Sequence, residues 1–498
     1  MLFCASFAKA QQYTPPCGTV GEMAEELIVR LLQNQATLAE NDGVTYRTTQ
    51  YVPVKFHLVG KNDGTGRLLE HYAFDQICAL NEDYAEMDIV FYVKGGFNYI
   101  DNSVTYENHA NTPFILTANK DNAAINIFCV KDATPTGDGL GTTLGYYSPG
   151  NDWIVVRNDE VGKNDATLAH ELGHFFSLPH PHNGWDSEPY DVSMHGNPVQ
   201  AFSPNGPPSE RQDGSNGTTA GDYISDTPPD YNFGFGWNDC DYDAGTMDPS
   251  GEIVDPDEKL WMGYFLHCNI DEYYFSPIQQ QLVLTDLASS QRFYIRPNYT
   301  PQHAIISETP ALTYPIDGAT TDNYNWVNLQ WEQVPGAQFY LLEISRIASF
   351  AIDPVEVIVY GNSKIITNLQ ADKTYFWRVT PMNEAYTCAG SSTIGNFKTG
   401  STTVSNQELS SVNQWSVAPN PVKANSSLTI NVDASVSFTA TINLRDVTGR
   451  QVRNIGDQSF NLGQQNREIS LSGLSAGVYF ISLDSEEGRT TKRIVVTD

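Results

Sequence analysis

The chain has 498 residues, with 59 acidic against 28 basic side chains and a formal net charge of −31. This length allows about two to five domains. A hydrophobic share of 40% and an aromatic share of 11% are enough to build cores, which excludes a wholly disordered protein. Phosphate contacts need clustered Lys and Arg, so the charge disfavours nucleic acid and anionic membrane surfaces as partners. After residue 10 no apolar run approaches about 18 residues, and we expect no membrane span.

The first residues and the cysteines indicate export. Residues 1–10 form a short apolar run that ends in Ala8-Lys9-Ala10, the A-x-A form of a signal-peptidase site. We expect a signal peptide here, with a chance apolar N-terminus as the alternative. Of the seven cysteines, Cys4 lies in this run and six follow it: Cys17, Cys78, Cys129, Cys240, Cys268 and Cys388. An even count in an exported chain permits disulfides.

Helices and strands are predicted to alternate over the first 180 residues. A mostly polar stretch, residues 11–50, contains one helical pattern at 23–32, and we treat this stretch as a pro-segment. The following elements are strands at 52–59, 89–93, 125–130, 139–147 and 153–156, and helices at 68–84 and 167–177. Such alternation around one sheet predicts an α/β (α+β) domain, which we place at residues 51–300.

The composition changes after residue 182. Residues 183–257 are rich in Gly, Pro, Asp, Asn and Ser, which indicates long irregular chain. A structureless stretch of that length in a compact domain is usually functional or stabilised by a ligand. A helix at 276–287, with Pro277 in its first turn, closes the domain.

Two all-β segments follow, joined by a Ser/Thr-rich linker at 399–411. In the first, at 308–400, the residues expected on the inward faces of a β-sandwich are Trp331, Tyr340, Leu342, Tyr375, Trp377 and Val379. This segment resembles a fibronectin type III module, with Leu369, Tyr375 and the closing residues 397–399 at the expected places. The second segment spans residues 415–498.

The stretch at 170–180, HELGHFFSLPH, carries the chemistry. His170 and His174 are one helical turn apart and can hold one metal ion between them. Pro179 ends the helix, and His180 can return as a third ligand. Three protein ligands leave an open position, as in a catalytic zinc site. Glu171 lies beside the first ligand, where it can reach a zinc-bound water.

Two other interpretations remain open from the residues alone. The histidines can be ordinary surface or core groups of an amphipathic helix. The motif can also form a structural zinc site that a fourth ligand closes, with His182 as the candidate.

The spacing resembles the metzincin metalloproteases, HExxHxxGxxH followed by a Met-turn. Ser177 stands where that family usually has Gly, at a position that needs positive φ, which costs another residue roughly 1 kcal/mol. The Met-turn candidate is Met262, followed by Tyr264; Met194 is the runner-up and lacks the trailing tyrosine. By this resemblance Met262 packs beneath the zinc site, and Tyr264 binds the oxyanion or occupies a resting coordination position.

Within the metzincins the chain is similar to the pappalysin and cytophagalysin group, over roughly residues 50–290. The similarity rests on residues 80–84, 221–228, 262–264 and 275–277, and on two cysteines. It implies a Cys240–Cys268 disulfide that braces the Met-turn. It also implies calcium in the loops after the zinc motif, for which Asp222, Asp226, Asp239, Asp241 and Asp243 are suitable ligands. A solvated acidic loop is the alternative.

Cys17 precedes the catalytic domain. A thiolate from a pro-segment could cap the zinc until the segment is removed, which makes Cys17 a candidate pro-segment switch. A structural disulfide and an uninvolved thiol are the alternatives.

Residues 415–498 resemble the C-terminal sorting domain of the type IX secretion system of Bacteroidetes. The motifs lie at 418–421, 444–450 and 474–481, followed by a basic patch at 489–493. Turns are expected at 446–449 and 475–477. The alternative is another Ig-like adhesive module. The resemblance implies the type IX secretion machinery as a partner and a secreted or surface-attached protein.

The sequence therefore predicts a secreted zinc endopeptidase that hydrolyses protein or peptide substrates, with Zn²⁺ and possible Ca²⁺ as cofactors. In this expectation Glu171 activates the zinc-bound water. The alternative function is a surface adhesin or binding protein whose metalloprotease domain is inactive. The intact Glu171 favours the enzyme.

Overall fold

The structure, a computed structural model, describes residues 15–40, 48–136, 143–352, 354–402, 409, 411–485 and 488–497. The predicted signal peptide and most of the linker lie outside these residues. By its internal contacts the chain divides into two compact units. The first comprises Met1–Thr309, Val334–Leu341 and Thr380–Gly390, and the second comprises Pro310–Gln333, Leu342–Val379 and Ser391–Asp498. Among the described residues, no helix has both the length and the apolar character that crossing a bilayer requires.

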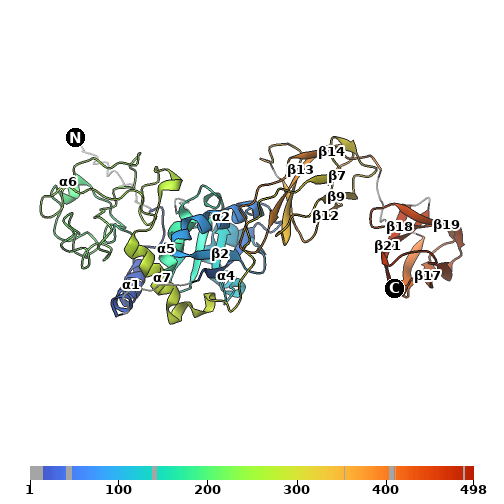
Figure 1. Ribbon diagram of the computed structural model, residues 1–498, viewed down its shortest axis with the longest axis horizontal. Coiled ribbons are helices and arrows are strands. Elements are labelled where there is room, and N and C mark those ends of the chain that lie inside the picture. The colour runs from blue at the N-terminus through green and yellow to red at the C-terminus, as the bar shows by residue number, and fades with distance from the viewer. Residues whose placement is uncertain are drawn as a thin grey trace, which may run out of the picture. The chain divides into compact units, whose positions relative to one another are not determined.

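A six-stranded sheet forms the centre of the first unit (Figure 1). Its order is β2 (Ile89–Val93), β1 (Gln50–Gly60), β4 (Ile125–Val130), β6 (Trp153–Arg157) and β5 (Gly145–Ser148), and β3 (Asn98–Asp101) also pairs with β1. β5 is antiparallel to β6, whereas the other pairs are parallel. β4 is buried along its whole length, because both of its faces pack against core. β5 is the last strand in this order and forms one edge of the sheet.

Helices cover both faces of this sheet. One core cluster includes side chains of α2 (Glu70–Asp83), α5 (Thr167–Phe175) and α7 (Pro277–Ala288). The opposite cluster includes side chains of α3 (Ser103–Glu107) and α4 (Pro113–Asn119). The described 3₁₀ turns are η1 (Ala85–Met87), η2 (His109–Asn111), η3 (Asn158–Glu160), η4 (Ile270–Glu272) and η5 (Ser290–Ile295). Sequence analysis missed β3, α3 and α4, which have only 4, 5 and 7 residues.

Residues 15–40, in the stretch expected to be a pro-segment, and the irregular region also have defined structure. α1 (Glu22–Glu40) extends beyond the predicted helix and contacts α7. Residues after α5 contain the short helix α6 (Val192–His195) and a core cluster of their own, rich in aromatic residues. Its buried members are Trp185, Val199, Tyr231, Phe233, Tyr242, Val254 and Phe265. The irregular chain is thus packed rather than open loop.

Two disulfides lie within the first unit. The expected Cys240–Cys268 bond is confirmed. A second bond, Cys78–Cys388, was not predicted and joins α2 to residues 380–390. Among the described residues, the free cysteines are Cys17 and Cys129, both buried.

Residues 312–398 form a β-sandwich. One sheet has the order β11 (Val355–Val359), β10 (Phe339–Ser345), β13 (Thr374–Met382), β14 (Gly395–Lys398) and β8 (Ala319–Thr320). The other has the order β12 (Ser363–Ile366), β9 (Val327–Trp331) and β7 (Leu312–Tyr314). The six side chains predicted to point inward are all buried.

Residues 412–497 form another two-sheet domain with a separate core. One sheet has the order β15 (Val412–Ala418), β17 (Ser427–Ala434) and β20 (Gly463–Ser470). The other has the order β16 (Val422–Lys423), β22 (Gly488–Thr497), β21 (Gly477–Ser485), β18 (Phe438–Asp446) and β19 (Gln451–Phe460). The turn predicted at 446–449 is present, and Asp446 Oδ1 accepts from Thr448 N at 3.0 Å. The turn predicted at 475–477 lies instead at 472–473, and Gly477 begins β21. An N-terminal α/β region followed by β-sandwich domains is confirmed.

Candidate metal centre

Helix α5 and the turn after it bring three histidines together. His170 and His174 lie one turn apart, with ring centroids separated by 4.7 Å. The helix ends at Phe175, and Ser177 in the turn after it takes a φ of 70° although it is not glycine. Leu178 N then donates to Gly173 O at 2.9 Å, which closes the end of the helix. This sharp reversal returns His180 to the same face as the other two.

The three Nε2 atoms converge on one point. His180 Nε2 lies 3.2 Å from His170 Nε2 and 3.1 Å from His174 Nε2. On the opposite side of each ring, Nδ1 lies beside an acceptor. For His170 this is Trp261 O at 2.7 Å, and for His174 it is Leu178 O at 2.7 Å. For His180 it is Asp186 Oδ1 at 2.6 Å. Carbonyl and carboxylate oxygens accept, so each Nδ1 carries the proton.

Burial keeps the rings neutral. It lowers the pKa of His170 to about 4 and the pKa of His174 and His180 well below the ordinary value. A neutral ring that is protonated at Nδ1 has a bare lone pair at Nε2. Three bare lone pairs facing one another repel, unless a cation lies between them.

The donor set fits zinc. Histidine nitrogens about 2.0–2.1 Å from a tetrahedral ion are about 3.3 Å from one another, close to the separations observed. Cys17 Sγ supplies a further donor 3.4 Å from His174 Nε2. Neutral imidazoles and one thiolate are preferred zinc ligands. In this set Cys17, rather than His182, is the fourth group within reach of the three histidines.

Glu171 is fully buried beside the first histidine. Burial raises the pKa of its carboxyl group to about 8. Thr19 Oγ1 donates to Glu171 Oε2 at 3.4 Å, whereas Oε1 has no partner among the described residues. One carboxylate oxygen is therefore free to accept a proton in the site.

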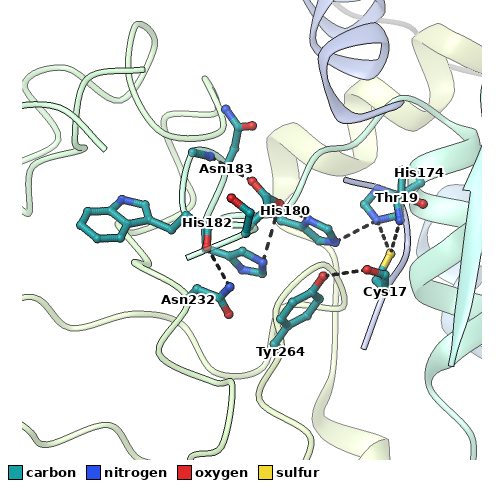
Figure 2. Close-up of polar contacts among 12 residues, drawn as sticks. Cys17, Thr19, His174, His180, His182, Asn183, Asn232 and Tyr264 are labelled. Atoms are coloured by element: carbon teal, nitrogen blue, oxygen red, sulfur yellow. Dashed lines mark hydrogen bonds and ion pairs between the residues drawn. The ribbon is translucent and has the colours of Figure 1, made fainter. Parts of the chain in front are cut away.

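The N-terminal residues around Cys17 lie at the edge strand β5. Cys17 lies next to His174 and His180 (Figure 2). Residues around Cys17 pair with β5 in the parallel sense: Leu144 N donates to Pro16 O at 2.7 Å, and Gly18 N donates to Gly145 O at 2.9 Å. Burial raises the pKa of the Cys17 thiol. A divalent cation reverses this preference and favours the thiolate.

Helix α1 follows Cys17 in the chain and contacts α7 and the turn after α5. Arg30 Nε and Nη2 donate to the two oxygens of the buried Asp286 on α7, at 2.7 and 2.5 Å. Asn34 Nδ2 donates to Ser177 Oγ at 2.8 Å and to Asp286 Oδ1 at 3.0 Å. Leu27 and Leu31 are buried on the same face of α1. Residues 15–40 thus contact the candidate metal centre through Cys17 and the region behind α5 through α1.

The residues expected from the Met-turn also lie here. Met262 is buried, and a Cβ at Gly173 would lie 2.2 Å from its Sδ, so the two residues meet beneath α5. Tyr264 points its hydroxyl at the Cys17 carbonyl, 3.5 Å away (Figure 2). Met194, the alternative, is 61% exposed on α6.

Sequence analysis missed Asp186, and it considered His182 only as a metal ligand. Asp186 Oδ1 accepts from His180 Nδ1, and its Oδ2 accepts from Gly184 N at 3.0 Å. His182 is buried and stacks on the His180 ring with centroids 4.6 Å apart. No sequence signal assigns these roles, because residues 181–186 have no helical or strand periodicity.

The five carboxylates expected to bind calcium differ in their burial and in their hydrogen-bond partners. Asp226 accepts from Ser276 Oγ at 2.7 Å and from Ile278 N at 2.8 Å, at the start of α7. Asp222 is buried and accepts from Ile224 N and Thr227 Oγ1. Its neighbour is Glu210, also buried, whose Oε2 has no partner among the described residues. Burial, and after it the nearby Asp222, raise the pKa of Glu210 well above its ordinary value. Asp239, Asp241 and Asp243 lie in a partly exposed loop.

Comparisons with known proteins concern the β-domains. No curated protein matches the chain. A crystal structure of chicken CNTN1 FN1-FN3 domains matches at 11% identity and a TM-score of 0.18, over 39% of this chain and 69% of that one. A crystal structure of FN3tt matches at 16% identity and a TM-score of 0.15, over 19% of this chain and 99% of that one.

A family match identifies the last domain. Residues 416–497 match the secretion system C-terminal sorting domain. These residues include nearly all of the separate core described above. The protein therefore carries a type IX secretion sorting domain, and it is exported to the cell surface or beyond it.

Proposed function

We propose that the first unit is a zinc-dependent endopeptidase that is made in a latent form. The observation that carries this proposal is the convergence of three neutral imidazoles, each with its Nδ1 bonded elsewhere and its Nε2 facing the same point. Beside them lies the buried carboxyl group of Glu171, one oxygen of which has no hydrogen-bond partner in the described part of the chain. The same groups in one place are the requirements for hydrolysing a peptide bond.

His170, His174 and His180 would hold zinc, which when bound polarises a carbonyl and lowers the pKa of water. Glu171 accepts a proton from the attacking water at Oε1. It then delivers that proton to the departing amine as the carbon–nitrogen bond breaks. Tyr264 donates a hydrogen bond to the carbonyl oxygen as negative charge develops on it. In the proposed latent form, the Tyr264 hydroxyl donates instead to the Cys17 carbonyl oxygen, which lies where the substrate carbonyl oxygen would bind.

Metal analysis and proteolysis test the activity together. After removal of the pro-segment, the protein should contain one zinc and cleave casein, and a chelator should stop cleavage. Glu171→Gln keeps the shape of the side chain but removes the base, so kcat should fall by about 10²- to 10⁴-fold with zinc retained. His180→Ala removes one of the three proposed zinc ligands and should lose zinc and cleavage. His303→Ala is its matched control, since the exposed His303 contacts Tyr51 and not the three histidines. Zinc-loaded protein that cleaves nothing would favour the adhesin alternative.

Latency is assigned to Cys17. Its Sγ lies beside His174 Nε2, so with zinc bound the thiolate would hold the position that substrate and water need. Cys17→Ala should raise the activity of the uncleaved protein, whereas Cys129→Ala, at the other buried thiol, should leave it latent. Unchanged latency in Cys17→Ala would overturn the assignment.

We also propose calcium at Glu210 and Asp222. Two adjacent buried carboxylates with an unpartnered oxygen need either protons or a hard cation. Without calcium, burial and then the nearby Asp222 raise the pKa of Glu210 above that of an ordinary glutamate, so the folded protein keeps this proton at pH values where the unfolded chain has lost it. Folding then binds protons over this window, so stability should fall as pH rises through it.

Thermal unfolding at pH 5 to 9 measures this dependence. Added calcium should abolish the fall in Tm, and Glu210→Gln should reduce both the fall and the calcium response. A Glu210→Gln protein with the calcium response of the unchanged protein would exclude this site.

A further inference from the structure

We propose that His182 is a positioning residue that supports the Tyr264 ring and so fixes the hydroxyl that acts on the substrate carbonyl. This inference rests on the proposed peptidase function and adds a residue to it. His182 is fully buried beside the candidate metal centre, although Cys17 rather than His182 is the fourth group near the three histidines. Burial of a polar ring costs free energy unless other contacts offset it.

Hydrogen bonds do not account for the place of this ring. Its Nδ1 lies 3.6 Å from Asp230 Oδ2, and its Nε2 lies 3.9 Å from Asp186 Oδ1. Both separations exceed the usual range of about 2.7–3.2 Å for a hydrogen bond between nitrogen and oxygen. Neither nitrogen has a hydrogen-bond partner among the described residues. The contacts that define the place of His182 are therefore those of its ring.

The ring packs against two groups of the centre at once. It stacks on the His180 ring, with centroids 4.6 Å apart and an interplanar angle of 8°. It also contacts the Tyr264 ring, at a centroid distance of 4.3 Å and an angle of 58° (Figure 2). The other two histidine rings near Tyr264 are farther away, His180 at 4.8 Å and His170 at 6.0 Å. Of these three, His182 therefore gives Tyr264 its nearest support.

Tyr264 needs this support because its hydroxyl has to act at one place. Its ring is buried, and its hydroxyl lies 3.5 Å from the Cys17 carbonyl oxygen. A donor that stabilises developing charge has to lie about 2.7–3.1 Å from the oxygen that carries it. A tyrosine side chain turns about two bonds, so close packing of the ring is what keeps the hydroxyl in that range. Loss of the His182 ring should therefore misplace the hydroxyl.

The zinc ligands should be affected much less. His180 keeps its orientation through Nδ1, which donates to Asp186 Oδ1 at 2.6 Å whether or not His182 is present. A substitution at His182 should therefore change the reaction through Tyr264 while zinc remains bound.

A double-mutant cycle tests this role in the full chain after removal of its pro-segment. Tyr264→Phe removes the hydroxyl and should lower kcat by about 100-fold. His182→Ala only misplaces it and should lower kcat by about 10-fold, with KM and zinc content unchanged. The double variant should be no slower than Tyr264→Phe, because no hydroxyl is left to position.

Two further variants separate the ring from the rest of the side chain. His182→Phe keeps a flat ring and should bring kcat back to within about 3-fold of the unchanged protein. His182→Leu fills most of the space without a flat ring, so it should show the loss expected of His182→Ala even if the alanine variant does not fold.

Inhibitor binding measures the same effect without turnover. A phosphinic peptide places a charged oxygen on a tetrahedral centre where the substrate has its carbonyl group. Its Kd, from isothermal titration calorimetry, should rise by about 10-fold in His182→Ala. His57→Ala is the matched control, since His57 is equally buried and stacks on Phe128 of the opposite core at 4.1 Å. It should lower Tm and leave kcat and the inhibitor Kd unchanged.

The outcomes separate this inference from the peptidase function. Multiplied losses in the double variant would show that His182 does not act through Tyr264. A loss in His182→Phe as large as in His182→Ala would mean that its nitrogens matter, and loss of zinc from His182→Phe would make it a ligand. Each of these results overturns the positioning role and leaves the peptidase standing. Absence of all cleavage by the unchanged, zinc-loaded protein would overturn the peptidase itself, and with it this inference.

Discussion

At the scale of single residues, Ser177 combines a strained backbone with a useful hydroxyl. Its φ of 70° lies in the left-handed region, which costs a non-glycine residue about 1 kcal/mol. In return, its Oγ accepts a hydrogen bond from Asn34 of the pro-segment. Sequence analysis identified the need for positive φ here, but the hydrogen bond depends on a helix about 140 residues away in the chain.

Substitutions at Ser177 should separate these two effects. Ser177→Gly relieves the backbone and should stabilise the mature enzyme by about 1 kcal/mol. The same change removes the bond to Asn34, so the pro-segment should be released faster during limited proteolysis. Urea unfolding of the mature protein and the half-life of the intact pro-segment are the two measurements.

Ser177→Ala is the control for this pair. It removes the hydroxyl but keeps the strained φ, so it should speed release without stabilising the mature enzyme. Equal stabilisation by Ala and Gly would show that backbone strain is not the cause.

Asp186 illustrates a residue whose role is only visible in three dimensions. It accepts from His180 Nδ1 and so fixes the ring with Nε2 toward the other histidines. A carboxylate in this position commonly changes metal affinity by about 10- to 100-fold when it is mutated.

Asp186→Asn should therefore weaken zinc binding by that factor, because an amide is a poorer acceptor and can present its NH₂ group instead. Competition with a chromogenic chelator measures the change. Asp191→Asn, at an exposed carboxylate that caps α6, is the matched control. Equal zinc affinity in the Asp186→Asn and unchanged proteins would exclude this positioning role.

At the scale of elements, the N-terminal residues 15–40 contact the rest of the first unit at two separate places, at the edge strand β5 and through α1. Sequence periodicity predicted that α1 is helical, but its partner could not be predicted, because Asp286 lies on a helix more than 250 residues away. Arg292 also donates to Asp286, at 3.0 Å, and to Asp152, at 2.6 Å. The ion pair between Arg30 and Asp286 is therefore part of a buried network behind α5.

Arg30→Ala should weaken the binding of α1 to α7 by about 2–3 kcal/mol of free energy. This is less than for an isolated buried ion pair, because Arg292 still neutralises Asp286. The uncleaved protein should then show some activity with Cys17 intact. Val29→Ala, at a side chain that is 58% exposed, is the control on the same helix. Cleavage of a quenched peptide by each uncleaved protein is the readout. Full latency in Arg30→Ala would mean that Cys17 and the β5 pairing suffice.

At the scale of the whole molecule, the sorting domain has a core of its own. Its buried residues lie between Leu409 and Val496 and form a cluster separate from that around α5. Folding of the metal centre should therefore be independent of it, although export depends on it.

A chain without residues 416–497 should remain inside the cell envelope while keeping its zinc and, after pro-segment removal, its peptidase activity. Cell fractionation and metal analysis measure the two properties, with the full chain as control. Loss of zinc from the shortened protein would show that the cores are coupled. Its appearance outside the cell would show that export uses another signal.

The sequence by itself determined the local features of this protein. The spacing predicted two histidines on a helix and a third after the turn that follows it. Runs of β-branched residues predicted the strands at 89–93 and 125–130, and Ser276 and Pro277 marked the start of α7. These follow from periodicity and from local backbone preferences, which a few neighbouring residues express.

Only the tertiary structure decided which distant groups meet. It paired Cys78 with Cys388, placed Cys17 beside His174, and set Asp186 behind His180. It also buried Glu210 beside Asp222 and packed the His182 ring against Tyr264. Long-range contacts of this kind arise from packing of the whole first unit, and no local pattern of residues records them.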